Sequence, residues 1–283
     1  MKVTIKELIE DSAKSVAFPK IALRILKLFE DDNLSAYHLA KAISLDPVLT
    51  AYILKMANSA YYNFAGKIKT LSDAIALIGF GEVRKIVVMA STKSAFSPSD
   101  FFDNLLWQHS LAVAIATSEL NLELKLTDEG SAYIMGLLHD IGKVIFKKSS
   151  KLNYIDILKE AYNNDLFSQN LEDKMYGYNH ADVGSNLLET WNFDQEIIDA
   201  VAFHHVKFTE LNHSFLKCSA MVNLADAFAN FMGIGRKDPM HDLTLLNNFN
   251  SAKFLNFYKE DYGEIISRIH KKFFILTQTF GGG

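Results

Sequence analysis

The sequence is poor in the features of secreted and membrane proteins. It has one cysteine, Cys218, which excludes a disulfide framework and a zinc site built on several cysteines. No apolar run is long enough to cross a bilayer. The first ten residues include Lys2, Lys6, Glu7 and Glu10 and lack the apolar segment of a signal peptide. We therefore expect a cytoplasmic protein with no membrane partner.

A strong charge of either sign is also absent. The sequence has 29 lysines and arginines against 33 aspartates and glutamates, a formal net charge of −4. This near balance argues against a general electrostatic attraction to nucleic acid or to anionic lipid. Acidic substrates stay open, because a bound metal ion can reverse the local field. Apolar residues make up 49% of the chain, which is typical of a packed globule.

Helix signals, in contrast, are dense along the whole chain, and strand signals are scarce. Thr4 and Glu7 have the spacing of a capping box. Asp46-Pro47 reads as an N-cap followed by proline at the first helical position. The segment 97–100, Ser-Pro-Ser-Asp, is the best internal boundary. The sequence therefore predicts an all-α fold.

Residues 35–58 read as two helices joined by a tight turn, which raises the alternative of a DNA-binding helix-turn-helix. The second helix would then have to contact DNA. Its face consists of Leu49, Ile53, Met56 and Ala57, and only Lys55 is basic. A recognition helix needs polar side chains for phosphates and base edges. We therefore expect two core helices, and DNA binding stays an outlying hypothesis.

The second half carries a set of histidines and aspartates that could hold metal ions. A single histidine on an apolar helix is usually a satisfied interior residue. Imidazole and carboxylate together suit Fe, Mn or Zn. This set also exceeds the needs of one ion, which favours a dinuclear centre able to activate water for attack on phosphorus. The candidate metal ligands are His109, His139, Asp140, His180, His204, His205 and Asp226.

Adjacent residues on a helix point about 100° apart, so His139 and Asp140 can share a site only between those directions or at a distorted helix end. Gly142 would supply the freedom for such a distortion. An aspartate between two ions can offer one oxygen to each. Asp226 lies in an apolar helix, where a carboxylate needs a metal or a salt bridge. Asp140 is therefore a candidate catalytic residue as well as a ligand.

Lys143 follows His139 by one helical turn and could hold a phosphate oxygen or give a proton to a leaving group. Position alone instead favours an exposed lysine at a helix C-terminus. The remaining histidines fit no cluster, and we expect them at the surface or at helix caps: His38, His213, His241 and His270.

These residues resemble a known pattern. His109, His139-Asp140 and Asp226 match the His…His-Asp…Asp signature of the HD superfamily of metal-dependent phosphohydrolases. The first half resembles the HDOD domain, an HD-related output domain of bacterial signalling proteins. The motifs that carry this resemblance are Phe18-Pro19, Ile43 to Pro47, Ala57 to Tyr62, Lys67-Ile68, Ala74-Ile75 and Leu77 to Gly79.

The resemblance implies a two-lobed helical bundle with an HD-like second lobe. It places an N-terminal lobe at 1–96, the HD-like lobe at 97–235 and a helical extension at 236–283. HDOD domains commonly lack the full ligand set, whereas this chain has it. Lys143, His180, His204 and His205 further resemble the extended set of HD-GYP phosphodiesterases. Val206 to Thr209 stand where those enzymes have Gly-Tyr-Pro.

Two functions follow as expectations. One is a bacterial signal-transduction output protein that binds a signalling protein partner and holds a structural or vestigial metal. The other is an active metal-dependent phosphohydrolase or phosphodiesterase on a nucleotide or cyclic nucleotide, with Lys143 and Asp140 as catalytic residues. The sequence leaves the partner, the substrate and the oligomeric state open.

Overall fold

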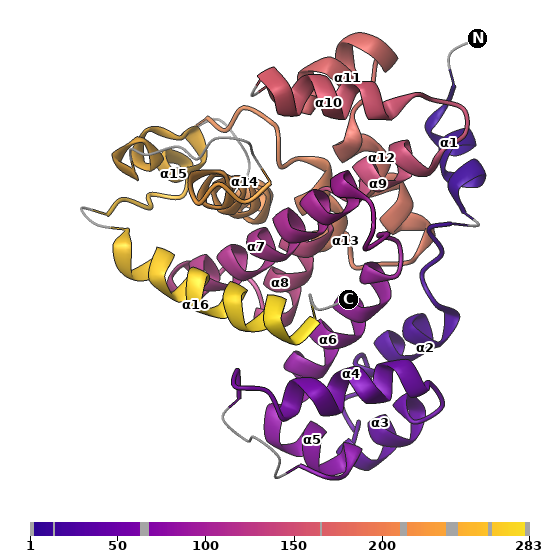
Figure 1. Cartoon of the computed structure of the whole chain (residues 1–283). Coiled ribbons are helices and arrows are strands. Elements are labelled where there is room, and N and C mark those ends of the chain that lie inside the picture. The colour runs from indigo at the N-terminus through magenta and orange to yellow at the C-terminus, as the bar shows by residue number, and fades with distance from the viewer. Residues whose placement is uncertain are drawn as a thin grey trace. The chain divides into compact units, whose positions relative to one another are not determined.

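The structure, a computed structural model of the chain, is built from helices (Figure 1). The described part of the chain contains no β-strand, so the predicted all-α fold is confirmed. The described residues are 3–13, 15–62, 68–164, 166–209, 214–235, 243–259 and 262–280.

Contacts divide the chain into two compact units. Unit 1 comprises residues 1–17 and 95–269, and unit 2 comprises residues 18–94 and 270–283. The lobe limits expected from the resemblance, at 96/97 and 235/236, remain a prediction about domains. Each unit is described separately below.

Unit 2 is a bundle of short helices with local sequence signals at their ends. Asp46 caps α4, because its carboxylate accepts hydrogen bonds from the backbone N–H groups of Val48 at 2.8 Å and Leu49 at 3.0 Å. Pro47 occupies the first helical position, where no N–H is needed. The helices are α2 (Lys20–Leu28), α3 (Ala36–Ile43), α4 (Pro47–Ala57), α5 (Leu71–Ile78), α6 (Phe80–Lys93) and the end of α16 (Gly263–Phe280).

The helix pair α3 and α4 belongs to the core of unit 2. Leu49, Ile53, Met56 and Ala57, the face that a DNA reader would present, are all buried. α4 packs against α5 and α6, and α3 packs against α5. The two helices therefore fit the expectation of a bundle core.

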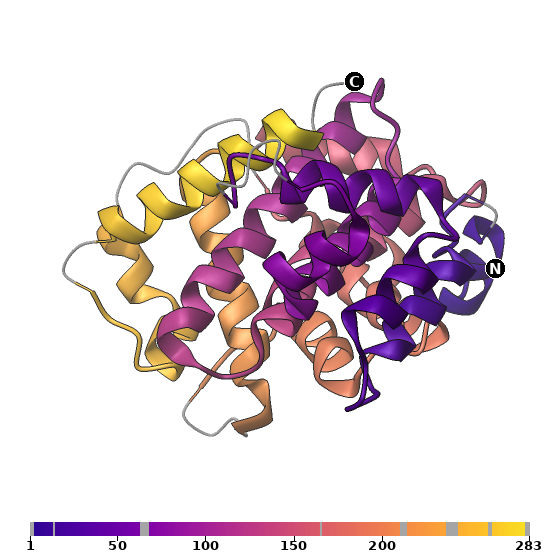
Figure 2. The same cartoon turned by 90° about the horizontal axis from the view of Figure 1, so that it is seen from below.

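Unit 1 is organised around the long helix α7, which packs against α8 and α14, while α12 packs against α9 and α13. Figures 1 and 2 both show α14 alongside α7. The helices of unit 1 are α1 (Ile5–Ser12), α7 (Phe101–Leu124), α8 (Glu129–Leu138), α9 (Ile141–Lys148), α10 (Tyr154–Asn164), α11 (Ser168–Tyr176), α12 (His180–Thr190), α13 (Gln195–Ala202), η1 (Ser214–Leu216), α14 (Lys217–Phe231), η2 (Leu243–Asn248), α15 (Asn250–Phe254) and the start of α16.

A glycine lets α7 and α8 approach closely. A Cβ atom added at Gly136 would lie 2.5 Å from Thr117 Oγ1 and 2.7 Å from Ala114 Cα. This close packing brings two candidate metal ligands near one another. The rings of His109 on α7 and His139 after α8 lie with their centroids 5.3 Å apart.

Gly142 allows a similar approach between α9 and α12. A Cβ atom added there would overlap the carbonyl oxygen of His180 and lie 2.9 Å from the backbone nitrogen of Gly184. The sequence suggested that Gly142 gives the helix end its freedom. That interpretation is wrong, because its φ is not positive and the helix break lies earlier, at His139 and Asp140. Gly142 is needed for close packing.

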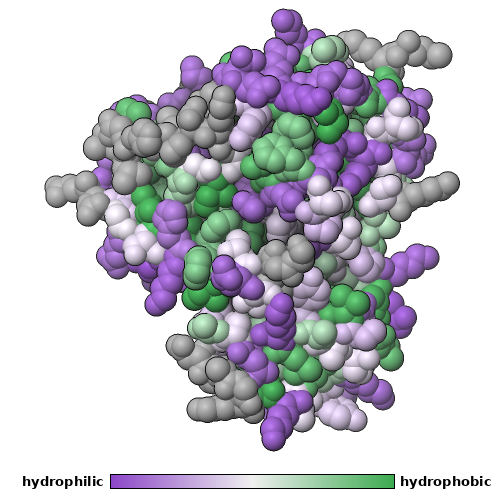
Figure 3. All heavy atoms as spheres, in the orientation of Figure 1, coloured by the Kyte–Doolittle hydropathy of each residue, from purple (hydrophilic) through white to green (hydrophobic). Residues whose placement is uncertain are grey.

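The side of the surface shown in Figure 3 is mixed in character. Figure 3 shows hydrophobic residues interspersed with hydrophilic ones over the side in view. In unit 2, Tyr37, Leu45 and Val48 are 67%, 71% and 59% exposed. Within the described ranges, no helix combines the length and the apolar character needed to cross a bilayer.

Candidate metal centre

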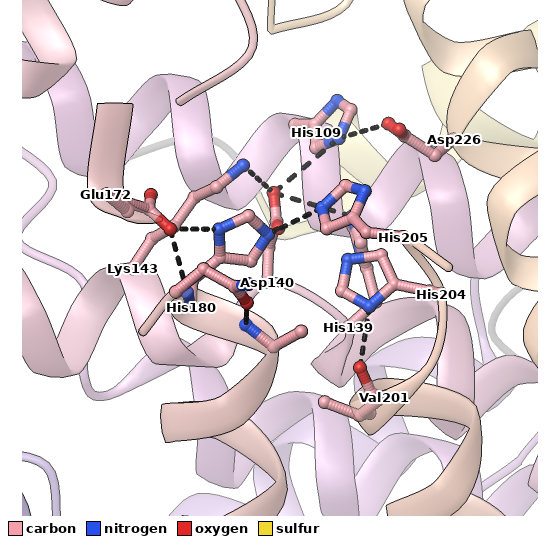
Figure 4. A network of polar contacts seen from close by, with 12 residues as sticks. His109, His139, Asp140, Lys143, Glu172, His180, Val201, His204, His205 and Asp226 are labelled. Carbon is pink, nitrogen blue, oxygen red and sulfur yellow. Dashed lines mark hydrogen bonds and ion pairs between the residues drawn. The ribbon is translucent and has the colours of Figure 1, made fainter. Parts of the chain in front are cut away.

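The seven residues predicted as metal ligands gather at one place in unit 1 (Figure 4). Each comes from an element that packs on its neighbours in the bundle. The contributions are His109 from α7, His139 and Asp140 from the junction of α8 and α9, His180 from the start of α12, His204 and His205 from the segment after α13, and Asp226 from α14.

The candidate ligands form two groups. The Asp140 group consists of Asp140, His180, His204 and His205, and the His109 group consists of His109, His139 and Asp226. Within each group the ligand atoms lie within 4.8 Å of one another. Each group is a candidate metal site.

Asp140 stands between the two groups and offers one oxygen to each. Its Oδ1 lies 3.0 Å from His180 Nε2 in its own group. Its Oδ2 lies 3.4 Å from His139 Nε2 and 3.8 Å from His109 Nε2. Asp140 therefore connects the two groups.

Four of the five histidines are fixed by a hydrogen bond at Nδ1. The ring N–H groups donate to carbonyl oxygens in three cases: His109 to Ile234, His139 to Gly136 and His204 to Val201, at 3.0, 2.8 and 2.6 Å.

The fourth ring, His180, donates from Nδ1 to the carboxylate of Glu172 at 2.6 Å. An acceptor at Nδ1 fixes the tautomer and leaves the Nε2 lone pair free to bind. All four rings therefore present Nε2 toward the centre.

One inward-facing nitrogen has no donor to satisfy it: His204 Nε2 is buried without a hydrogen bond in the described part of the chain. Asp140 Oδ1 meets the ring of His180, whose Nε2 lies 3.0 Å away. His180 Nε2 lies 2.8 Å from His205 Nε2. Nitrogens and oxygens that face one another in this way need a proton or a cation between them. The residues present therefore fit a divalent transition metal.

The electrostatics place a proton on His180 when no metal is bound. Burial opposes the charge, but the carboxylates of Glu172 and Asp140 outweigh it and raise the pKa of His180 to about 9. Burial likewise opposes the charge of Glu172, and His180 lowers the pKa of Glu172 to about 2. Burial and the nearby rings of His139 and His180 lower the pKa of His204 to about 3. Burial opposes the charge of His109 as well, but the Asp226 carboxylate outweighs it and raises the pKa of His109. A metal ion would therefore compete with protons on His180 and His109.

Lys143 lies inside the site, and its ammonium nitrogen donates to Asp140 Oδ2 at 2.7 Å. Its side chain is only 16% exposed. The position-based interpretation of Lys143 as an exposed helix-end lysine is therefore wrong. Burial opposes its charge, but the Asp140 and Glu172 carboxylates outweigh this and raise the pKa of Lys143. The group stays a cation at neutral pH.

A cavity of about 120 Å³ opens onto the centre. One wall is polar and includes His109, Asp140, Lys143, His180, His205 and Asp226. Much of the remaining lining is apolar and comes from α7, α10 and the segment before α11, with Phe102, Leu106, Leu158, Tyr162, Leu166 and Phe167. Phe102 and Tyr162 meet edge-on, with centroids 6.4 Å apart.

Three residues of the site carried no signal in the sequence analysis. Glu172 contacts His180, Asn230 donates to Asp226 Oδ1 at 3.0 Å, and Gly235 lies directly against the ring of His109. Glu172 stands in an otherwise polar helix, so composition could not single it out. Among the other histidines, His38 and His270 are exposed as expected. His213 and His241 lie outside the described residues.

The fold is that of an all-helical protein with a candidate metal centre in one unit. The chain belongs to the HDOD domain family, which matches residues 16–207, more than half of its length. The resemblance stated from the sequence motifs is thereby confirmed.

Solved structures share this fold over nearly the whole chain. An HDOD domain protein of unknown function from Geobacter sulfurreducens has a TM-score of 0.78 at 24% identity, covering 96% of this chain and 97% of its own. A protein described as a candidate phosphohydrolase from Shewanella amazonensis has a TM-score of 0.75 at 22% identity, with the same coverage. A candidate signal transduction protein from Marinobacter aquaeolei also scores 0.75, at 19% identity, covering 96% of this chain and 60% of its own.

A curated relative is longer than this chain. An uncharacterized protein of Treponema pallidum is 24% identical over 194 residues, which is 66% of this chain and 37% of the relative. The chain therefore spans well under half the length of the curated relative that it matches.

Proposed function

We propose that this HDOD protein is a metal-dependent phosphohydrolase with a dinuclear centre of Fe, Mn or Zn. The observation that carries the proposal is the convergence of fixed imidazole Nε2 atoms around Asp140, beside a cavity. The ligands would be His109, His139, Asp140, His180, His204, His205 and Asp226.

Two divalent ions, when bound, supply Lewis-acid activation of water and of phosphoryl oxygens. The chain's own residues orient the substrate. Lys143 faces the cavity beside Asp140, where its ammonium group can hold a phosphate oxygen or give a proton to the leaving group. Asn230 holds Asp226 in place through its amide.

The apolar wall indicates the kind of ester. Phe102, Tyr162 and Phe167 offer aromatic surface within reach of the polar wall. A flat group such as a nucleobase can pack against aromatic rings, whereas a strongly hydrated sugar phosphate gains little there. This supports a nucleotide or cyclic nucleotide as the substrate class.

The test is a hydrolysis screen on protein purified without chelator or nickel resin. It would compare p-nitrophenyl phosphate, bis-p-nitrophenyl phosphate and a panel of nucleotides, with Fe, Mn and Zn. We expect turnover that needs metal and is lost in Asp140→Ala. Absence of hydrolysis with about two equivalents of metal bound would overturn the enzymatic proposal.

A regulatory role is the second candidate, and family membership favours it. In that case the chain is a bacterial signal-transduction output protein that binds a protein partner, and its metal centre is structural. The exposed Tyr37, Leu45 and Val48 of unit 2 support a contact surface. Full metal occupancy without turnover on any ester would favour this candidate over the first.

A further inference from the structure

Glu172 is a buried carboxylate next to the metal centre but outside its ligand set. It is 0% exposed and lies on α11. Its Oε2 accepts two hydrogen bonds from His180, from Nδ1 at 2.6 Å and from the backbone N–H at 2.7 Å. Its Oε1 accepts from the hydroxyl of Tyr154 at 2.5 Å. Figure 4 shows Glu172 on the side of His180 away from Asp140.

This contact makes His180 different from the other fixed rings. His109, His139 and His204 donate to neutral carbonyl oxygens, whereas His180 donates to a charged side chain. A carboxylate on the far nitrogen fixes the tautomer and raises the basicity of the ligating nitrogen. The bond from the backbone N–H of His180 holds the carboxylate in place, and the bond from Nδ1 fixes the ring against rotation.

The orientation of the His180 ring matters because its Nε2 is central to the Asp140 group. That nitrogen lies 3.0 Å from Asp140 Oδ1 and 2.8 Å from His205 Nε2. A rotation of the ring would remove it from both neighbours. The ring therefore has to be held by something outside the ligand set.

We propose that Glu172 is the positioning residue of the Asp140 group, and that its carboxylate is what lets this group retain its metal ion. The inference rests on the proposed metal centre. The His109 group contacts neither Glu172 nor Tyr154 through any hydrogen bond found in the described residues. Glu172 therefore acts on one of the two ions.

The experiment is zinc titration of the metal-free protein by calorimetry, with ¹⁵N NMR of the imidazole nitrogens to show which rings coordinate. We expect two ions in the wild type. In Glu172→Ala the affinity of the Asp140 group should fall about 10- to 100-fold, and the His180 Nε2 signal should lose its coordination shift. The ion in the His109 group should keep its affinity.

Glu172→Gln provides a second test in case the alanine variant misfolds. The amide keeps an acceptor for His180 and the shape of the side chain, but it lacks the charge. We expect a folded protein whose Asp140 group binds zinc with an affinity between those of wild type and Glu172→Ala. An affinity equal to that of the wild type would overturn the proposal.

Two control variants separate positioning from a structural role. Glu119 is also fully buried in unit 1, and its carboxylate binds Arg268 at 2.7 Å, outside the metal centre. Glu119→Ala should lower thermal stability and leave both zinc sites intact. Tyr154→Phe removes the bond to Oε1 but leaves both bonds between Glu172 and His180, so it should barely change zinc affinity.

Two results would count against the inference in different ways. If zinc binds twice to wild type and equally well to Glu172→Ala, the positioning role is wrong and the metal centre stands. If the wild type binds no zinc, the proposed function fails and the inference fails with it.

Discussion

Unit 1 and unit 2 bury different kinds of polar side chain. Among the described residues of unit 2, buried Ser91 and Thr92 bond to carbonyls of their own helix at 2.7 and 2.8 Å, and Lys85 pairs with Glu82. Unit 1 instead buries a cluster of imidazoles and carboxylates from many elements. Burying such groups is costly unless they are paired or bind a metal. The difference indicates that unit 1 keeps its cluster for function, whereas the polar groups of unit 2 are satisfied locally.

The largest expected effect comes from removing the carboxylate between the two groups. Asp140→Ala should abolish metal binding in both, because Asp140 lies against His180 on one side and His139 on the other. Loss of metal removes several kcal/mol of transition-state stabilisation, so activity should fall by about 10³-fold or more. Elemental analysis measures the metal content, and the hydrolysis assay measures the activity.

The matched control for Asp140→Ala is Asp103→Ala. Asp103 is a fully buried carboxylate of unit 1 that binds Lys147 and Lys148 at 2.8 and 2.9 Å. Its loss should destabilise the unit and spare the metal content. Equal metal loss in both variants would mean that any defect in the unit 1 core releases metal.

The second prediction concerns pH. A metal ion must displace the proton of His180, whose pKa is raised to about 9. Apparent metal affinity should therefore rise about tenfold per pH unit and level off near pH 9. Titrations at several pH values measure the slope, and a flat profile between pH 7 and 8 would contradict the displaced proton.

The same group makes the metal-free protein sensitive to alkali. The folded-state pKa of His180 is raised from 6.5 to about 9, so its stabilising contribution is complete below pH 6.5 and lost as the pH rises to about 9. His204, whose pKa is lowered to about 3, acts in the opposite direction below pH 6.5. We expect maximum stability of the metal-free unit 1 near pH 6.5, measurable by denaturant titration with hydrogen exchange on unit 1.

The third prediction compares one glycine from each unit. Gly142→Ala forces a methyl group against the backbone of His180 and should cost about 1–3 kcal/mol of stability and weaken metal binding. Gly81 on α6 has open space around it, and Gly81→Ala should stabilise by up to about 1 kcal/mol. Denaturant titrations compare the two variants. Equal tolerance at both positions would show that α9 and α12 can separate without harm.

The smallest expected effect lies in unit 2. Asp46→Ala removes the cap of α4 and should cost about 1 kcal/mol, because two backbone N–H groups lose their acceptor. Metal content should stay at the wild-type value. A loss of metal in this variant would break the separation of roles between the two units.

The sequence was informative where the cause of a structure is local. The Asp46-Pro47 pair predicted the start of α4, because a cap and a proline act within one turn. The order of His109, His139-Asp140 and Asp226 predicted a shared site through resemblance, and the structure brings these residues together. Their role as ligands stays a prediction until metal is measured.

The sequence was uninformative where the cause is a contact between distant elements. Glu172 looks like the solvated acids around it, since nothing local shows that α11 turns it toward His180. Lys143 was expected at the surface because only the packing of α9 on α12 reveals its burial. Gly142 was expected to give the helix end its conformational freedom, because its close contact with α12 cannot be seen in the sequence. Such positions require the three-dimensional packing.

Helices α10 and α11 serve two purposes at once. Tyr162, Phe167 and Ser168 line the cavity, and Glu172 holds His180 from behind. Substitutions in these two helices could abolish metal binding in a relative while all seven candidate ligands remain in its sequence. Under the proposed function, an inventory of ligands is an incomplete guide to which relatives bind metal, and the residue aligned with Glu172 is the one to inspect next.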